Sequence, residues 1–161
     1  FRIYINDDVI GVELGGAIKN VLAIAAGIIE GLDFGANARA ALITRGLAEM
    51  MRLGQAMGAN PKTMTGLAGM GDLVLTCTDD QSRNRRLGLA LAQGETAQQY
   101  MDKLGQVVEG FHAAQVVYEI AKKSQVEMPI CEQVWHVLDK KMELKIAISE
   151  LLNRNMKEEF I

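Results

Sequence analysis

Hydrophobic positions in this chain recur mainly every three or four residues, the spacing typical of amphipathic helices. Turn residues punctuate this pattern, which predicts eight helical segments, at residues 9–32, 37–57, 61–67 (a short helix or turn), 83–93, 96–104, 111–123, 128–138 and 145–155. Only residues 1–6 alternate with the period of two that is typical of a strand. The pattern therefore predicts an all-α fold with one short N-terminal strand.

The first predicted helix is strongly apolar, and Lys19 is its only charged residue between Glu13 and Glu30. Two glycines, Gly15 and Gly16, lie one turn before this lysine, so a ligand or another helix could approach it closely. Apolar neighbours also disfavour the ammonium form, which suits a lysine for proton transfer. The alternative interpretation is a solvent-facing lysine whose neighbouring glycines serve only packing.

The second predicted helix carries a charged pair. Arg45 and Glu49 are four residues apart, the spacing of an ion pair on one helix face. We expect the two side chains to pair along the helix.

Composition narrows the class of protein. A chain of 161 residues suits one domain with a real core, and its 49% hydrophobic and 5% aromatic content with only two prolines favours helices. The net charge of −3 does not favour a nucleic-acid binder. Cys77 and Cys131 lie far apart without clustered histidines, so we expect neither a metal site nor a disulfide framework, and a cytoplasmic location.

Membrane insertion is not expected. The apolar run at residues 14–29 is shorter than the roughly twenty residues that span a bilayer, and Lys19 lies in its middle. The run is therefore predicted to be a buried helix of a soluble protein.

A glycine-rich segment precedes Asp72. Gly69 and Gly71 invite comparison with a dinucleotide-binding fingerprint, but no strand precedes them and Val74 stands where the third glycine belongs. The segment is better interpreted as a hinge that delivers Asp72, with Thr76 one helical turn later on the same face. Taken alone, an aspartate in this position is more often a helix cap.

The run S-R-N-R-R predicts the start of a helix. Ser82 or Asp80 can cap it, and Arg83 and Asn84 then lie beside the free backbone amides, where a phosphate binds well. A solvated helix face explains these residues about as well, whereas nucleic-acid binding is a weaker explanation in an acidic domain.

Six runs along the chain together resemble one enzyme family. They are F-R-I-Y, G-V-E-L-G-G-A-I-K-N, G-A-N-A-R-A-A-L-I-T-R-G-L-A-E-M, G-D-L-V-L-T-C-T, Q-S-R-N-R-R and G-Q-V-V-E-G. In order and spacing they resemble the C-terminal half of bacterial NAD(P)-dependent glycerol-3-phosphate dehydrogenases, over essentially the whole chain.

The resemblance implies a fold and an activity. Residues 7–161 would form a helical substrate domain of the 6-phosphogluconate-dehydrogenase C-terminal-like type, and residues 1–6 would be the last strand of a dinucleotide-binding domain that this chain lacks. The family interconverts dihydroxyacetone phosphate and sn-glycerol 3-phosphate for phospholipid synthesis. NAD(P) would be bound mainly by the absent domain, so the chain is expected to be a fragment that is inactive alone.

The resemblance also implies roles for individual residues. Lys19 would be the catalytic lysine that protonates the substrate carbonyl. Asp72, with Thr76 as a weaker candidate, would bind substrate hydroxyls and hold Lys19. The remaining positions fall on the phosphate-recognising segment, Ser82, Arg83 and Asn84, and on the surface that closes onto the cofactor, Arg83, Val107 and Glu109.

Two alternatives stay open at this point. The chain could be the helical domain of another two-domain dehydrogenase that acts on hydroxyacids or sugar acids, or a helical dimerisation module without chemistry. Exposed apolar helix faces would allow a homodimer in either case. The choice between NAD and NADP depends on a residue of the absent domain.

Overall fold

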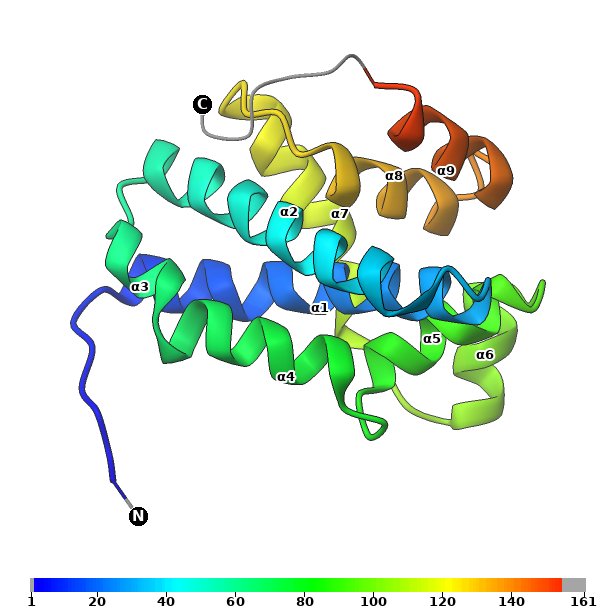
Figure 1. Ribbon diagram of the computed structural model, residues 1–161, viewed down its shortest axis with the longest axis horizontal. Helices are drawn as coiled ribbons and strands as arrows, with labels where there is room; N and C mark the ends of the chain where they lie inside the picture. The colour runs from blue at the N-terminus through cyan, green and yellow to red at the C-terminus, as the bar shows by residue number, and fades with distance from the viewer. Residues whose placement is uncertain (1, 155–161) are drawn as a thin grey trace.

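The computed structural model describes residues 2–154, which form a bundle of helices and contain no strand (Figure 1). In chain order the elements are α1 (Val9–Gly31), α2 (Gly35–Ala56), α3 (Pro61–Thr65), the π-helical turn η1 (Leu67–Gly71), α4 (Asp72–Thr78), α5 (Arg83–Ala92), α6 (Ala97–Leu104), α7 (Glu109–Lys123), α8 (Pro129–Leu138) and α9 (Leu144–Leu152). The all-α prediction is confirmed for this part of the chain.

The predicted N-terminal strand does not form within residues 2–6, and its assignment to a dinucleotide-binding domain stays a prediction. Residues 2–6 have no regular secondary structure, are exposed, and run away from the helices (Figure 1). An isolated strand leaves its backbone groups unpaired, and the described residues offer it no partner strand. Phe1 and the end of the helix predicted at 145–155 lie outside the described residues.

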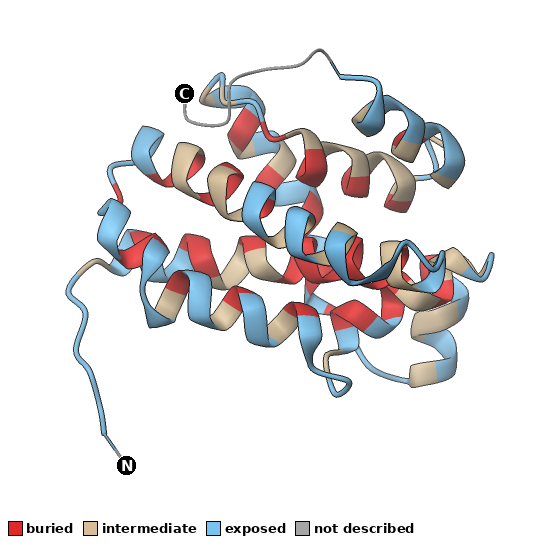
Figure 2. Ribbon diagram, viewed as in Figure 1, coloured by how far each residue is buried: buried red, intermediate tan, exposed pale blue. Residues whose placement is uncertain are grey.

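Helix α1 is the centre of the molecule, with α2, α4, α5 and α7 packed around it (Figure 1). Ile18, Leu22 and Ile24 on this helix are almost completely buried, and buried residues follow its whole length (Figure 2). Asp8 caps its N-terminus, because its Oδ1 accepts a hydrogen bond of 2.9 Å from the backbone N–H of Gly11. The most apolar predicted helix therefore supplies the core against which the other elements are placed.

By length and composition α1 could also cross a membrane. It has 23 residues, and 67% of its most apolar window is buried inside the bundle. Burial of this kind is typical of the core helix of a globular domain.

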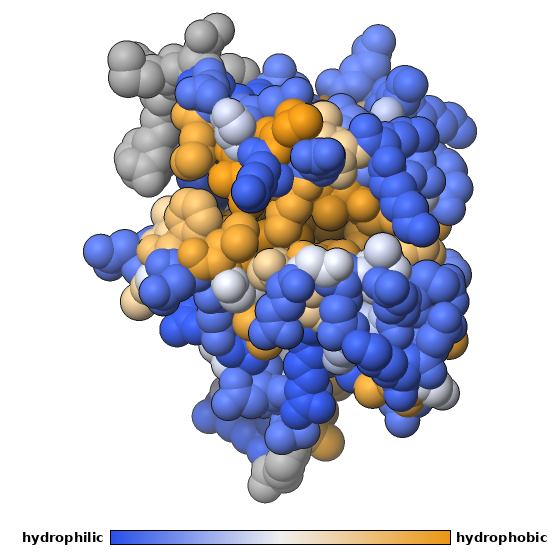
Figure 3. Space-filling model, turned by 90° about the vertical axis from the view of Figure 1, so that its right-hand side faces the viewer, coloured by the Kyte–Doolittle hydropathy of each residue, from blue (hydrophilic) through white to orange (hydrophobic). Residues whose placement is uncertain are grey.

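An apolar groove opens between α2, α8 and α9, on the face that Figure 3 shows as a hollow between two polar regions. Its volume is about 600 Å³, and its lining is mainly apolar. Glu49 is among the lining residues, but its carboxylate accepts hydrogen bonds from the backbone N–H groups of Ile130 (2.7 Å) and Cys131 (3.1 Å) at the start of α8. The ion pair expected between Arg45 and Glu49 is therefore wrong, since the carboxylate instead satisfies the free amides of a helix N-terminus.

Candidate active site

Lys19 and Asp72 form an ion pair although they are 53 residues apart in sequence. The Nζ atom of Lys19, on α1, donates to Oδ2 of Asp72, at the start of α4, over 2.5 Å. The two side chains are 21% and 34% exposed, so the pair is partly shielded yet open to a small ligand. A charge-assisted hydrogen bond of this length fixes the direction of the ammonium group.

Thr76 supports the same site from one turn further along α4. Its Oγ1 donates to the backbone oxygen of Asp72 (2.6 Å) and lies 3.4 Å from Oδ1 of the same residue. The sequence prediction that Thr76 shares a helix face with Asp72 is confirmed.

Two glycines allow Asp72 to reach Lys19. A Cβ added at Gly69 would collide with the backbone of Met64, so only glycine permits the tight path of η1. A Cβ added at Gly15 would lie 2.8 Å from the carbonyl oxygen of Ala68, so glycine here lets η1 lie directly on α1. A Cβ added at Gly16 meets no atom within 4 Å, which leaves open space beside Lys19.

A buried network of amide groups connects the helix that carries Lys19 with the segment Ser82–Asn84, which is predicted to recognise phosphate. Asn84 Nδ2 donates to Asn20 Oδ1 (2.9 Å), and the backbone N–H of Gly110 donates to Asn84 Oδ1 (2.8 Å). Asn20 Nδ2 in turn donates to Gly16 O (3.1 Å) and to Glu109 Oε2 (3.3 Å). The residue after Lys19 thus contacts the residue after Arg83, which places the two predicted segments side by side.

Ser82 and Arg83 lie at the start of α5. Ser82, rather than Asp80, caps the helix, and its Oγ accepts from the backbone N–H of Arg85 (3.3 Å). Arg83 is exposed and donates to neutral oxygens only, Val107 O (3.2 Å) and Gln106 Oε1 (3.4 Å). Because no carboxylate within residues 2–154 lies in ion-pair range of Arg83, its positive charge is available to an anion.

Val107 lies beside Arg83 on the connector that precedes α7, and Glu109 is the first residue of that helix. Val107 is 59% exposed, and Glu109 is exposed apart from its bond to Asn20. An exposed cation next to an exposed apolar side chain can contact part of a dinucleotide.

Sequence reasoning missed two residues that organise this region. Asn20 directly follows Lys19 in the G-G-A-I-K-N run, which was a usable signal, yet it was not assigned a role. Arg85 is buried within the S-R-N-R-R run, although a run of arginines ordinarily indicates a solvated face.

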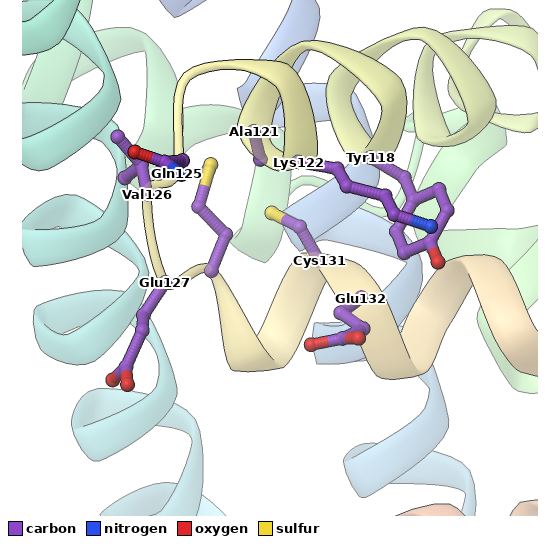
Figure 4. Close-up of a pocket in the computed structure, with 9 residues that line it drawn as sticks. Tyr118, Ala121, Lys122, Gln125, Val126, Glu127, Cys131 and Glu132 are labelled. Carbon is purple, nitrogen blue, oxygen red and sulfur yellow. The ribbon is translucent and has the colours of Figure 1, made fainter.

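A separate hollow of about 410 Å³ lies between α7 and α8 (Figure 4). Its lining includes Tyr118, Lys122 and Cys131, and none of the predicted site residues. Complete burial raises the pKa of the Cys131 thiol well above its ordinary value, so this sulfur is not a reactive thiolate. Within residues 2–154 no group of three or more His, Cys, Asp or Glu side chains could hold a metal ion.

Comparison with known families decides between the alternatives. Residues 8–149 match the family described as NAD-dependent glycerol-3-phosphate dehydrogenase C-terminus. The chain belongs to this family.

Relatives of this glycerol-3-phosphate dehydrogenase C-terminal domain are similar over nearly all of it. Glycerol-3-phosphate dehydrogenase [NAD(P)+] of Haemophilus ducreyi is 58% identical over 159 residues, which cover 99% of this chain and 47% of that protein. The enzyme of the same name from Colwellia psychrerythraea is 60% identical and is covered to 48%. The chain therefore spans about half the length of these relatives.

Solved structures of glycerol-3-phosphate dehydrogenases share its fold. The crystal structure from Coxiella burnetii superimposes with a TM-score of 0.91 at 54% identity, over 96% of this chain and 47% of that one. The structure from Saccharomyces cerevisiae gives a TM-score of 0.84 at 29% identity and is covered to 45%. The helical arrangement is thus shared between bacterial and yeast members.

Proposed function

We propose that this chain is the substrate-binding and catalytic-lysine domain of an NAD(P)-dependent glycerol-3-phosphate dehydrogenase. The full enzyme would interconvert dihydroxyacetone phosphate and sn-glycerol 3-phosphate and so supply glycerophospholipid synthesis. The observation that carries the proposal is the partly shielded pair of Lys19 and Asp72, with open space at Gly16 beside it.

Lys19 would act on the substrate oxygen. The bound NAD(P)H supplies the hydride that reduces the carbonyl carbon. As negative charge develops on the carbonyl oxygen, the Lys19 ammonium donates a proton to it, and in the reverse direction the amine takes the proton back. Asp72 orients the ammonium through Oδ2, while its Oδ1, which has only a 3.4 Å contact to Thr76, can accept a hydrogen bond from a substrate hydroxyl.

The phosphate group would bind at the start of α5. Arg83 offers an exposed guanidinium that has no carboxylate partner among the described residues, and the amides of the first turn add donors. Ser82 caps that turn, so its hydroxyl hydrogen can still point to the phosphate. Asn84 uses one N–H of its amide for Asn20, and the second N–H remains for the ligand.

The cofactor would be shared between this chain and the remainder of the full-length protein. Arg83, Val107 and Glu109 would contact it from this side, and the part of the relatives that this chain does not cover would hold most of it. We therefore propose that the chain alone does not turn over substrate.

Location and assembly follow the same proposal. Cys77 and Cys131 are both buried free thiols, which supports a reducing, cytoplasmic location. The apolar groove between α2, α8 and α9 supports association into a homodimer.

Substitution of Lys19 tests the proposed function. In the full-length protein, Lys19→Met should lower kcat for dihydroxyacetone phosphate by about 10²- to 10⁴-fold, the usual contribution of a positioned acid. NADH oxidation measures this, and Lys103→Met is the control, since Lys103 is exposed and pairs with Glu95. Full turnover by Lys19→Met, or robust turnover by the isolated chain, would refute the proposal.

A further inference from the structure

Arg85 is a buried arginine in the first turn of α5, next to the proposed phosphate-binding residues. It is only 5% exposed, although arginine is rarely buried unless it is paired. Its Nε donates to Oε2 of Glu30 over 3.0 Å, and its Nη2 donates to Oε1 of the same carboxylate. The guanidinium and Glu30 therefore form a two-point, planar contact whose direction is fixed.

The same guanidinium also fixes the turn that precedes α5. Its Nη1 donates to Oδ1 of Asp80 over 2.9 Å, and Arg86 Nε donates to the backbone oxygen of Asp80 over 2.6 Å. Asp80 itself is 86% exposed, so the strong part of this contact is the one to Glu30. Arg85 thereby connects the end of α1 with the turn that carries Ser82.

Helices α1 and α5 are in backbone contact beside this ion pair. A Cβ added at Gly27 of α1 would collide with the carbonyl oxygen of Arg85, and one added at Gly88 of α5 would collide with the carbonyl oxygen of Ile24. The crossing point of the two helices is thus fixed by backbone packing. The ion pair fixes the remaining freedom, which is the direction of the first turn of α5.

Burial of an ion pair does not by itself explain its presence. Removal of two charges from water is costly, and an apolar pair of similar volume often stabilises a protein equally well. What an apolar pair does not provide is a directional contact between the helix that carries Lys19 and the turn that carries Arg83. The fixed orientation of the planar, two-point contact with Glu30 is therefore the property that distinguishes Arg85.

We infer that Arg85 is a positioning residue that sets Ser82 and Arg83 at the right distance from Lys19 to hold a phosphorylated substrate. The inference rests on the proposed function, because it assumes that the start of α5 binds the phosphate. Glu30 acts with Arg85, as the anchor on α1. The carboxylates of Glu30 and Asp80 neutralise Arg85, so of these two arginines it is Arg83 whose charge is left for the phosphate.

Steady-state kinetics of the full-length protein test this role with two substrates, dihydroxyacetone phosphate and unphosphorylated dihydroxyacetone. Arg85→Lys keeps the positive charge but removes the two-point contact with Glu30. It should raise KM for the phosphorylated substrate by about 10- to 100-fold, as small displacements of a binding group do. Its kcat/KM for dihydroxyacetone should stay within about twofold of the wild type, because that substrate makes no phosphate contact. Glu30→Gln should raise the same KM by a smaller factor.

The control is Arg39→Gln. Arg39, on α2, also pairs with Glu30 (3.3 Å), but within residues 2–154 it makes no hydrogen bond or ion pair with α5, so its loss should leave both substrates unaffected. If Arg85→Lys does not fold, Asp80→Asn and Glu30→Gln carry the test, since both residues are partly or largely exposed. An equal loss of kcat/KM for both substrates, or an unchanged KM for the phosphorylated one, would overturn the inference.

Arg83→Ala separates this inference from the proposed function. If Arg83→Ala abolishes the preference for the phosphorylated substrate while Arg85→Lys leaves it intact, the positioning role is wrong and the proposed site stands. If Arg83→Ala also leaves the preference intact, the phosphate site itself is wrong.

Discussion

Glu49 shows how far the fold can change the chemistry of a single side chain. Its carboxyl is almost completely buried, and loss of hydration raises its pKa from 4.5 to about 7, although the amides of Ile130 and Cys131 and the charge of Arg52 act in the opposite direction. The folded protein therefore keeps a proton on Glu49 at pH values where the unfolded chain has lost it.

Stability should consequently fall as the pH rises from about 4.5 to 7, and this contribution should level off above that range. A shift of this size corresponds to about 3 kcal/mol of the free energy of unfolding. Glu49→Gln cannot ionise, so urea unfolding at pH 5 and pH 7.5 should show a smaller loss for this variant than for the wild type. Equal losses in the two proteins would contradict the assigned cause.

Spacing alone did not reveal the environment of Glu49. An i,i+4 arginine and glutamate are compatible with a surface pair, but the start of α8, about 80 residues later, offers two free amides to the same carboxylate. The sequence contains no local signal of that contact. Ser82 was predictable as a cap because a cap and its helix are adjacent in sequence.

At the scale of elements, Gly15 and Gly16 illustrate two different uses of glycine in one helix. Gly15 is required because the carbonyl oxygen of Ala68 in η1 lies against it, whereas Gly16 faces open space. The sequence predicted a close approach near Lys19 but could not say which glycine served packing and which faced a ligand.

Substitution of Gly15 and of Gly16 by alanine should therefore change the free energy of unfolding in opposite directions. Gly16→Ala should raise the free energy of unfolding by about 0.5–1 kcal/mol through better helix propensity. Gly15→Ala should lower it by about 1–3 kcal/mol, because the new methyl forces η1 away from α1. Urea titrations of both variants measure the difference, and shifts of the same sign would show that the assigned packing is wrong.

Most helices were predicted to within a few residues, but η1 and α4 were interpreted as a glycine hinge and were not among the predicted helical segments. Gly, Pro and capping residues mark most helix ends, as with Asn60 and Pro61 at the start of α3 and Gly105 after α6. A strand depends on a partner elsewhere, and residues 2–6 have none within the described chain. Local sequence patterns thus predicted helices, whose hydrogen bonds lie within one segment, better than a strand, which needs a partner segment.

At the scale of the whole molecule, the site depends on contacts between distant segments. Lys19 and Asp72 meet across 53 residues, and the amides of Asn20 and Asn84 meet across 64. Periodicity predicted the helices but neither of these contacts. The resemblance to a family implied the pairing of Lys19 with Asp72, whereas the contact of Asn20 with Asn84 was not predicted. The structure brings the predicted residues into two neighbouring groups that the Asn20–Asn84 bond connects.

The central claim is that Lys19 and Asp72 work as one unit in proton transfer. A double-mutant cycle on kcat of the full-length protein, with Lys19→Met, Asp72→Asn and both together, tests it directly. Residues that act as a unit are strongly non-additive, so the double variant should be no slower than Lys19→Met alone. A double variant whose loss equals the product of the two single losses would contradict the account.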